Sequence, residues 1–95
     1  MARPLYEIAE EIRKTWVDKN GQPNVNYAAK PYLEVLDVLT DITDKYFEDP
    51  ATSIVNYFLS NASSYRGDDA RRIKAELKAM LLGLDTWYTT MLGSR

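Results

Sequence analysis

The chain has 95 residues, 45% of them hydrophobic and 27% charged, with a net charge of −2. This length supports one core, for which seven Tyr, two Trp and two Phe supply large apolar groups. Cysteine and histidine are absent, which excludes disulfides, thiolate metal sites and catalytic triads that contain histidine. Two carboxylates could still act as acid and base, but so small a domain rarely buries two of them in a cleft. We therefore expect a non-enzymatic protein without metal or cofactor.

No apolar run approaches the roughly 20 residues that a membrane helix needs. The first residues, Met1 to Leu5, lack the apolar centre of a signal peptide. A cytoplasmic protein that does not enter the membrane is the expectation.

The first helix is predicted from about Pro4 to Val17, because proline suits the first helical turn. Its apolar residues follow the i, i+3, i+4, i+7 spacing of a buried stripe: Leu5, Ile8, Ala9, Ile12 and Trp16. The next segment, from Asn20 to Asn24, is predicted to be a loop, since Asn-Gly favours positive φ and proline blocks a helix.

A second helix is predicted to begin near Asn24 or Asn26, with Pro31 either in its first turn or at a kink. The residues expected on its inner face are Tyr32, Leu36, Leu39, Ile42 and Tyr46. The pattern allows this helix to end either near Leu39 or near Phe47, because the β-branched residues between these positions weaken a helix.

Asp49 and Pro50 predict the start of a third helix, as N-cap and first helical residue. This helix is expected to end near Asn61 and to bury Ile54, Tyr57 or Phe58, and Ala62.

A fourth helix is predicted after the turn formed by residues 63–67, with Asp68 as its cap. Its buried stripe is expected to contain Ala70, Ile73, Leu77, Met80 and Leu81. The same stripe continues with Leu84, Trp87, Tyr88 and Met91. Gly83 is either a C′ residue that ends the helix or an interior glycine, and we favour a break there.

The predicted fold is all-α. We expect a single domain over residues 1–95, a compact bundle of four helices with residues 84–95 as a short fifth helix or tail. Short loops predict antiparallel neighbours.

A row of acidic residues is the first candidate site. Its members are spaced by three, four, three and four residues: Glu34, Asp37, Asp41, Asp44 and Glu48. On one helix they would share a face, about 5 Å apart along the axis. Such a row resembles the charge line of a nucleic-acid strand and could occupy a basic groove of a protein. The alternative is a solvated helix face without a partner.

A basic group is the second candidate and favours a small helix-turn-helix-like DNA-binding regulator. It consists of Arg66, Arg71, Arg72, Lys74 and Lys78. The turn before it contains Gly67, as in many DNA-binding proteins, but is longer than usual. Neighbouring acids such as Glu76 indicate ordinary surface pairing instead, which makes direct nucleic-acid binding the less favoured interpretation.

Aromatic residues form a third candidate. Tyr27 and Tyr32 flank Pro31, and most aromatic residues at helical spacing belong to a core. If the C-terminal segment projects, Trp87, Tyr88 and Met91 would form an interface for a homodimer or for an oligomeric structural protein.

Several segments carry a resemblance to other proteins: residues 3–13, 31–33, 53–62, 65–67 and 70–77. With these, the chain resembles small helical proteins without an assigned activity that tailed bacteriophages and prophages encode. The resemblance covers most of residues 3–80, and no functional residue is carried over.

The resemblance implies an accessory protein in the cytoplasm of a bacterial host. Small acidic phage proteins often act by occupying host proteins, including nucleic-acid-guided defence machinery. The leading hypothesis is therefore a protein that binds and inhibits a host protein, in the manner of an anti-CRISPR protein, through its acidic residues.

Overall fold

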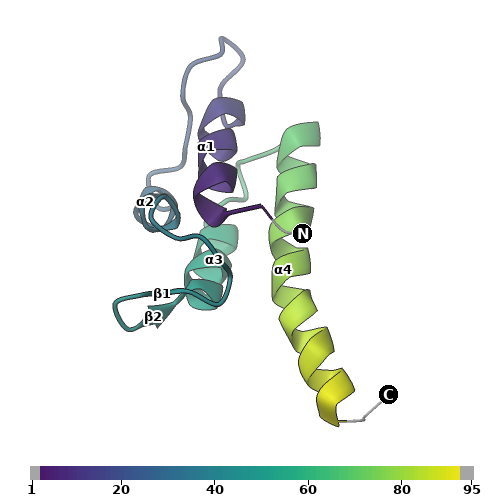
Figure 1. The fold of residues 1–95 in the computed structure, drawn as a ribbon. Coiled ribbons are helices and arrows are strands. Elements are labelled where there is room, and N and C mark those ends of the chain that lie inside the picture. Colours follow the sequence, from purple (N-terminus) through teal and green to yellow (C-terminus); the bar gives the residue numbers. More distant parts are fainter. Residues whose placement is uncertain (1–2, 93–95) are drawn as a thin grey trace.

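The computed structural model describes residues 3–92, with side chains described as far as Gly83. Its elements in chain order are α1 (Leu5–Thr15), α2 (Lys30–Leu36), β1 (Lys45–Tyr46), β2 (Asp49–Pro50), α3 (Ala51–Ser60) and α4 (Asp68–Leu92). α1 and α4 lie side by side and run in opposite directions, and α2 contacts α1 and α3 on the side of the molecule away from α4 (Figure 1). The described part of the chain is mostly helical. The all-α expectation is corrected by the small antiparallel hairpin of β1 and β2.

The stripe predicted for the first helix forms the centre of the core. Leu5, Ile8, Ala9 and Ile12 are buried along α1. Trp16 follows the helix and is also buried, with its ring stacked on Tyr65 at 4.9 Å and edge-on to Phe58 at 6.2 Å.

The N-terminus of α1 is satisfied by main-chain carbonyls from a distant segment. The N–H groups of Leu5 and Tyr6 donate to the carbonyl oxygens of Thr40 and Leu39 at 2.9 and 3.0 Å. Pro4 is the N-cap residue and forms no side-chain cap. The loop after α2 therefore supplies acceptors that a capping side chain would otherwise supply.

α2 is much shorter than predicted. It begins at Lys30 with Pro31 in the first turn and ends at Leu36, before both of the ends that the sequence left open. Its core contribution is Leu33 and Leu36, and Leu39 is buried just beyond it. Three residues expected on its inner face are only partly buried: Tyr32, Ile42 and Tyr46.

The hairpin occupies the place where the sequence predicted a helix N-cap at Asp49. Tyr46 pairs with Asp49 across a two-residue loop of Phe47 and Glu48. Pro50 is extended, with φ −70° and ψ 149°, and is itself the N-cap of α3. The prediction that Asp49 caps the third helix was wrong, because Asp49 belongs to a strand. α3 buries Ala51, Ile54, Val55 and Phe58 as a helix that ends one residue before Asn61.

α4 runs without a break from Asp68 to Leu92, so the predicted break at Gly83 was wrong. Gly83 is an interior helical glycine, and a Cβ added there would meet no atom within 4 Å. Gly67, with φ 108°, makes the turn before the helix, and Asp68 lies inside the first turn. The predicted stripe is buried at Ala70, Ile73 and Leu77 and partly buried at Met80 and Leu81.

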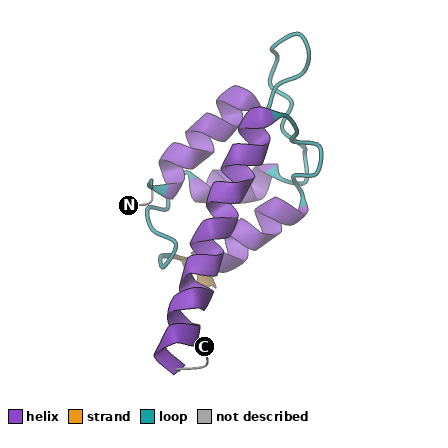
Figure 2. Ribbon diagram, turned by 90° about the vertical axis from the view of Figure 1, so that its right-hand side faces the viewer, coloured by secondary structure: helices purple, strands orange, loops and turns teal. Residues whose placement is uncertain are grey.

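The C-terminal part of α4 extends beyond the other helices (Figures 1 and 2). None of the helices described within residues 3–92 combines the length and the apolar character that a membrane crossing requires.

Candidate functional site

The structure divides the predicted acidic row into two groups, because α2 ends at Leu36. Glu34 lies on α2, and Asp37 is its C-cap. The Arg13 guanidinium binds the Asp37 carboxylate through Nη1–Oδ1 and Nη2–Oδ2, at 2.5 and 2.6 Å. Asp37 is therefore paired within the chain. The five acids would share a face only on one continuous helix, and this condition is not met, because α2 ends at Leu36.

The second group lies in the loop after α2, where two carboxylates hold the backbone. Asp44 accepts hydrogen bonds from the N–H groups of Thr40 and Asp41, each at 2.9 Å. Asp41 accepts from the hydroxyl and the N–H of Thr43, and these bonds lower the pKa of the Asp41 carboxyl. Such side-chain bonds compete with helical ones. They explain why α2 does not continue, and they fold the acids into a compact turn.

We refer to residues 41–50 as the acidic hairpin. It contains four acidic residues and one basic residue: Asp41, Asp44, Glu48, Asp49 and Lys45. Glu48 and Asp49 are exposed at its end. The acidic hairpin thus contains three members of the predicted row, together with Asp49.

Phe47 is at the tip of the acidic hairpin. Its side chain is 85% exposed, and its φ of 56° lies in the left-handed region. Its ring contacts only Tyr46 edge-on, at 4.8 Å, among the aromatic residues described. Sequence reasoning missed this residue as a functional candidate. Pro50 carried a signal, since the residue before a proline avoids the helical region and a helix through Phe47 to Asp49 was disfavoured.

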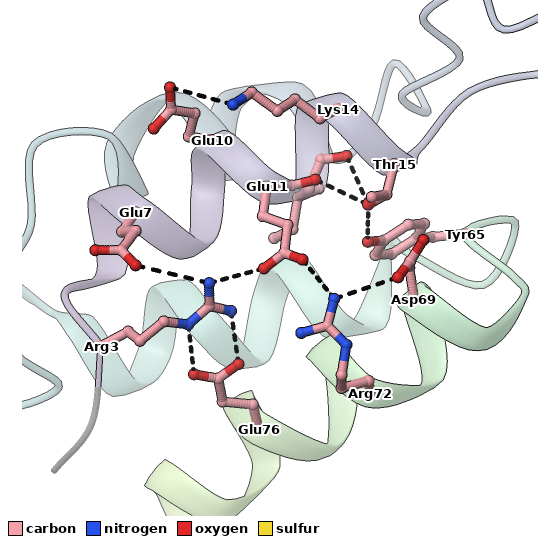
Figure 3. A network of polar contacts seen from close by, with 11 residues as sticks. Arg3, Glu7, Glu10, Glu11, Lys14, Thr15, Tyr65, Asp69, Arg72 and Glu76 are labelled. Atoms are coloured by element: carbon pink, nitrogen blue, oxygen red, sulfur yellow. Dashed lines mark hydrogen bonds and ion pairs between the residues drawn. The ribbon is translucent and has the colours of Figure 1, made fainter.

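The predicted basic group is largely paired inside the chain. Arg72 binds Glu11 of α1 and lies 3.3 Å from Asp69 (Figure 3). Arg71 binds Asp68 at 2.7 Å. The guanidinium of Arg66 makes a long hydrogen bond to the carbonyl of Ser63, at 3.4 Å.

Lys74 is also held within the chain. Its ammonium donates to the main-chain carbonyl of Tyr65 at 2.7 Å and lies 5.7 Å from the centre of the Tyr65 ring. Desolvation by burial lowers the pKa of Lys74, with further contributions from Lys78 and Arg66. Of the five basic residues only Lys78 has no contact described here, and it borders a groove between α3 and α4.

An ion-pair network joins α1 to α4. Arg3 binds Glu76 through two hydrogen bonds of 3.0 and 2.7 Å, and its Nη1 lies 2.7 Å from Glu11 (Figure 3). The guanidinium groups of Arg72 and Arg3 lower the pKa of the Glu11 carboxyl. Beside this network the Thr15 hydroxyl and the Tyr65 hydroxyl are 2.5 Å apart. These contacts join α1 to α4 and pair the charges of Arg3, Glu11, Arg72 and Glu76 with one another.

The remaining aromatic candidates lie in different elements of the structure. Tyr27 is 86% exposed in the loop before α2, and Tyr32 packs against Tyr57 of α3 with ring centres 5.4 Å apart. The side chains of Trp87, Tyr88 and Met91 lie outside the described residues, although the backbone there is part of α4.

No protein-family model, no curated protein and no solved structure was found to match this chain, so the candidate site stands on its own geometry.

Proposed function

We propose that this protein is a non-enzymatic binding protein that docks its acidic hairpin on a basic surface of another protein. Phe47 is the central contact of this interface and enters an apolar pocket of the partner. The observation that carries the proposal is the exposed Phe47 in a left-handed conformation at the tip of a two-residue loop.

The conformation of Phe47 has a cost that a glycine would avoid. A left-handed backbone costs an L-residue roughly 1–2 kcal/mol, and exposure of the ring forgoes burial of a large apolar surface. Strained residues cluster at functional sites. Rigid aromatic side chains with a polar rim are typical of the residues that dominate protein interfaces. A role in binding accounts for both features of Phe47.

The charge around Phe47 indicates the chemistry of the partner. The acidic hairpin contains four carboxylates and one ammonium, with Glu48 and Asp49 exposed next to Phe47, so it attracts a positively charged surface. A protein that binds nucleic acid offers such a surface, with charges spaced to receive phosphates. The resemblance to phage proteins supports a host protein of this kind as the partner and inhibition as the consequence.

The DNA-binding alternative has less support. Arg71 and Arg72 are paired with acidic side chains, and Lys74 is held by the carbonyl of Tyr65. Binding to phosphates would have to break these contacts.

The test is a capture experiment from bacterial lysate with three tagged proteins: the natural chain, Phe47→Gly, and Tyr27→Ala. Glycine suits the left-handed position, so Phe47→Gly keeps the hairpin folded while it removes the anchor. Tyr27→Ala removes an equally exposed aromatic ring from another loop. We expect the natural chain and Tyr27→Ala to recover the same basic protein, and Phe47→Gly to lose it.

A second variant tests the charge. Glu48→Lys with Asp49→Lys reverses two exposed carboxylates that hold no backbone group, unlike Asp41 and Asp44. We expect this variant to lose the basic partner as well. Recovery of the same partner by Phe47→Gly and by the charge-reversed chain would refute the proposal.

A further inference from the structure

We propose that Lys74 of α4 forms a Schiff base with small aldehydes that carry a phosphate group, and that Arg66 and Arg71 bind this group. The site is a pocket between the turn before α4 and the first two turns of that helix. Three features of the molecule support it: the pocket, the position of the Lys74 ammonium and the guanidinium groups beside it. The acidic hairpin has no part in this reaction.

The pocket has a volume of about 300 Å³, at the lower end of the range for small-molecule sites. Gly67, with a φ of 108°, makes the turn that brings Arg66 to the same pocket as Arg71 and Lys74. The described lining contains three cationic side chains and no acidic one, and consists of Tyr65, Arg66, Gly67, Ala70, Arg71 and Lys74. Such an accumulation of positive charge in a hollow favours an anionic ligand.

The Lys74 ammonium has a defined position in this pocket. It donates to the main-chain carbonyl of Tyr65 at 2.7 Å and lies 5.7 Å from the centre of the Tyr65 ring. Tyr65 is itself buried in the core, so the nitrogen is held by a residue that the fold fixes in place. A nucleophile that is already positioned pays a smaller entropic cost when it reacts.

The surroundings of Lys74 favour the neutral amine, which is the nucleophilic form. Desolvation by burial lowers the pKa of Lys74, and the charges of Lys78 and Arg66 lower it further. When the neutral nitrogen attacks an aldehyde carbon, the two amine hydrogens leave with the aldehyde oxygen as water, and a C=N bond replaces the C=O bond. Protonation of the Schiff base from solvent restores one N–H. That N–H can donate to the Tyr65 carbonyl, so the reaction does not require the loss of this contact.

The guanidinium groups account for the preference for a phosphate. Arg66 makes only a long hydrogen bond of 3.4 Å to a main-chain carbonyl among the described contacts. Arg71 is bound to Asp68, but these side chains are 74% and 98% exposed, so solvent screens the pair. A guanidinium can bind a phosphate through two parallel N–H donors. A single phosphate needs only these residues, whereas a nucleic-acid strand would also have to recruit Arg72, which is bound to α1.

The test uses pyridoxal phosphate and pyridoxal, two aldehydes that differ by the phosphate group. The natural chain is incubated with each, borohydride reduces the Schiff base to a stable amine, and peptide mass spectrometry locates the modified lysines. The measured quantity is the ratio of modification at Lys74 to that at Lys19, an exposed lysine in the loop after α1. Because each ratio comes from one reaction, the different reactivities of the two aldehydes cancel.

We expect pyridoxal phosphate to favour Lys74 over Lys19, with a ratio about tenfold higher than that of pyridoxal. This is the effect of one charge-assisted hydrogen bond on an equilibrium constant. Excess inorganic phosphate should lower the ratio for pyridoxal phosphate.

Two variants locate the phosphate contact. Arg66→Gln removes an exposed guanidinium from the pocket and should abolish most of the difference between the two aldehydes. Lys30→Gln, which removes a positive charge from α2 on the side of the molecule away from α4, should leave the difference unchanged (Figure 1). The proposal is overturned if Lys74 is modified no more than Lys19, if both aldehydes give the same ratio, or if Arg66→Gln behaves like the natural chain. None of these substitutions touches the acidic hairpin, so the result is independent of the capture experiment.

Discussion

Arg13 and Asp37 form a bidentate ion pair that joins α1 to the C-terminal end of α2, with nitrogen–oxygen distances of 2.5 and 2.6 Å. Their side chains are 40% and 38% exposed, so solvent screens the pair. We expect a coupling energy of roughly 0.5–1 kcal/mol in a double-mutant cycle of Arg13→Ala and Asp37→Ala, measured by urea unfolding. A coupling energy of zero would show that the ion pair with Arg13 does not hold Asp37, which would then be available to a partner like the other acids of the predicted row.

Replacement of Phe47 should stabilise the fold. Phe47→Gly removes the left-handed strain and loses the edge-on contact with Tyr46, for a net gain of about 0.5–1 kcal/mol in the free energy of unfolding. Phe47→Ala keeps the strain and should show no such gain. The urea midpoints of the natural chain, Phe47→Gly and Phe47→Ala measure the differences in the free energy of unfolding, provided that the dependence on urea concentration has the same slope in all three. If glycine and alanine destabilise equally, the ring has a structural role and the interpretation of Phe47 as an anchor fails.

Gly83→Ala tests the continuity of α4. Because Gly83 is inside a helix and a Cβ there meets no atom, alanine should stabilise the protein by about 1 kcal/mol and increase its helicity. Thermal unfolding followed by circular dichroism measures both effects. A helix that ends at this position would give the opposite result, since alanine is strained in the left-handed conformation of a C′ residue.

Acid should weaken the contact between α1 and α4. The guanidinium groups of Arg72 and Arg3 hold the pKa of Glu11 below its ordinary value of 4.5. A carboxyl with a lowered folded-state pKa adds stability above its unfolded pKa, and this is lost as the pH falls through the folded-state value. We expect Glu11→Gln to lower stability at neutral pH and to flatten the loss of stability in acid.

Urea unfolding at a series of pH values provides the measurement for Glu11. The control is Glu10→Gln, which changes a neighbouring glutamate whose contact with Lys14 is 3.8 Å long. Its stability should follow the same pH dependence as the natural chain. If both substitutions flattened the loss of stability in acid equally, the ion pairs of Glu11 with Arg3 and Arg72 would not be the cause of that loss.

Local patterns predicted those parts of the fold in which one face of a helix is buried. The burial of Leu5, Ile8 and Ile12 could be predicted without knowing which residues they contact, because their spacing alone indicates a buried stripe. The end of α2 could not be obtained in this way. It depends on Asp44, which accepts N–H groups of Thr40 and Asp41 and so replaces helical bonds with a turn. The spacing of apolar residues along a sequence does not show when a side chain such as Asp44 will compete for backbone N–H groups in this way.

The candidate site was predicted in part. The sequence pattern grouped Asp41, Asp44 and Glu48 because they would share one face of a continuous helix. In the structure a turn and a hairpin bring these residues into one segment instead. Phe47 was missed because an exposed aromatic looks like a core residue when only the sequence is known. The ion pair between Arg3 and Glu76 joins residues 73 positions apart, and no local pattern reports such a contact.

The carbonyls of Leu39 and Thr40 have a consequence for the order of events in folding. They receive the first N–H groups of α1, yet they are synthesised more than thirty residues after that helix begins. With 11 residues, α1 is too short to be stable in water by itself. We therefore expect α1 to be largely unformed in a nascent chain until the turn after α2 has been synthesised. On this argument α1 becomes ordered together with the turn that accepts its first N–H groups, and not before it.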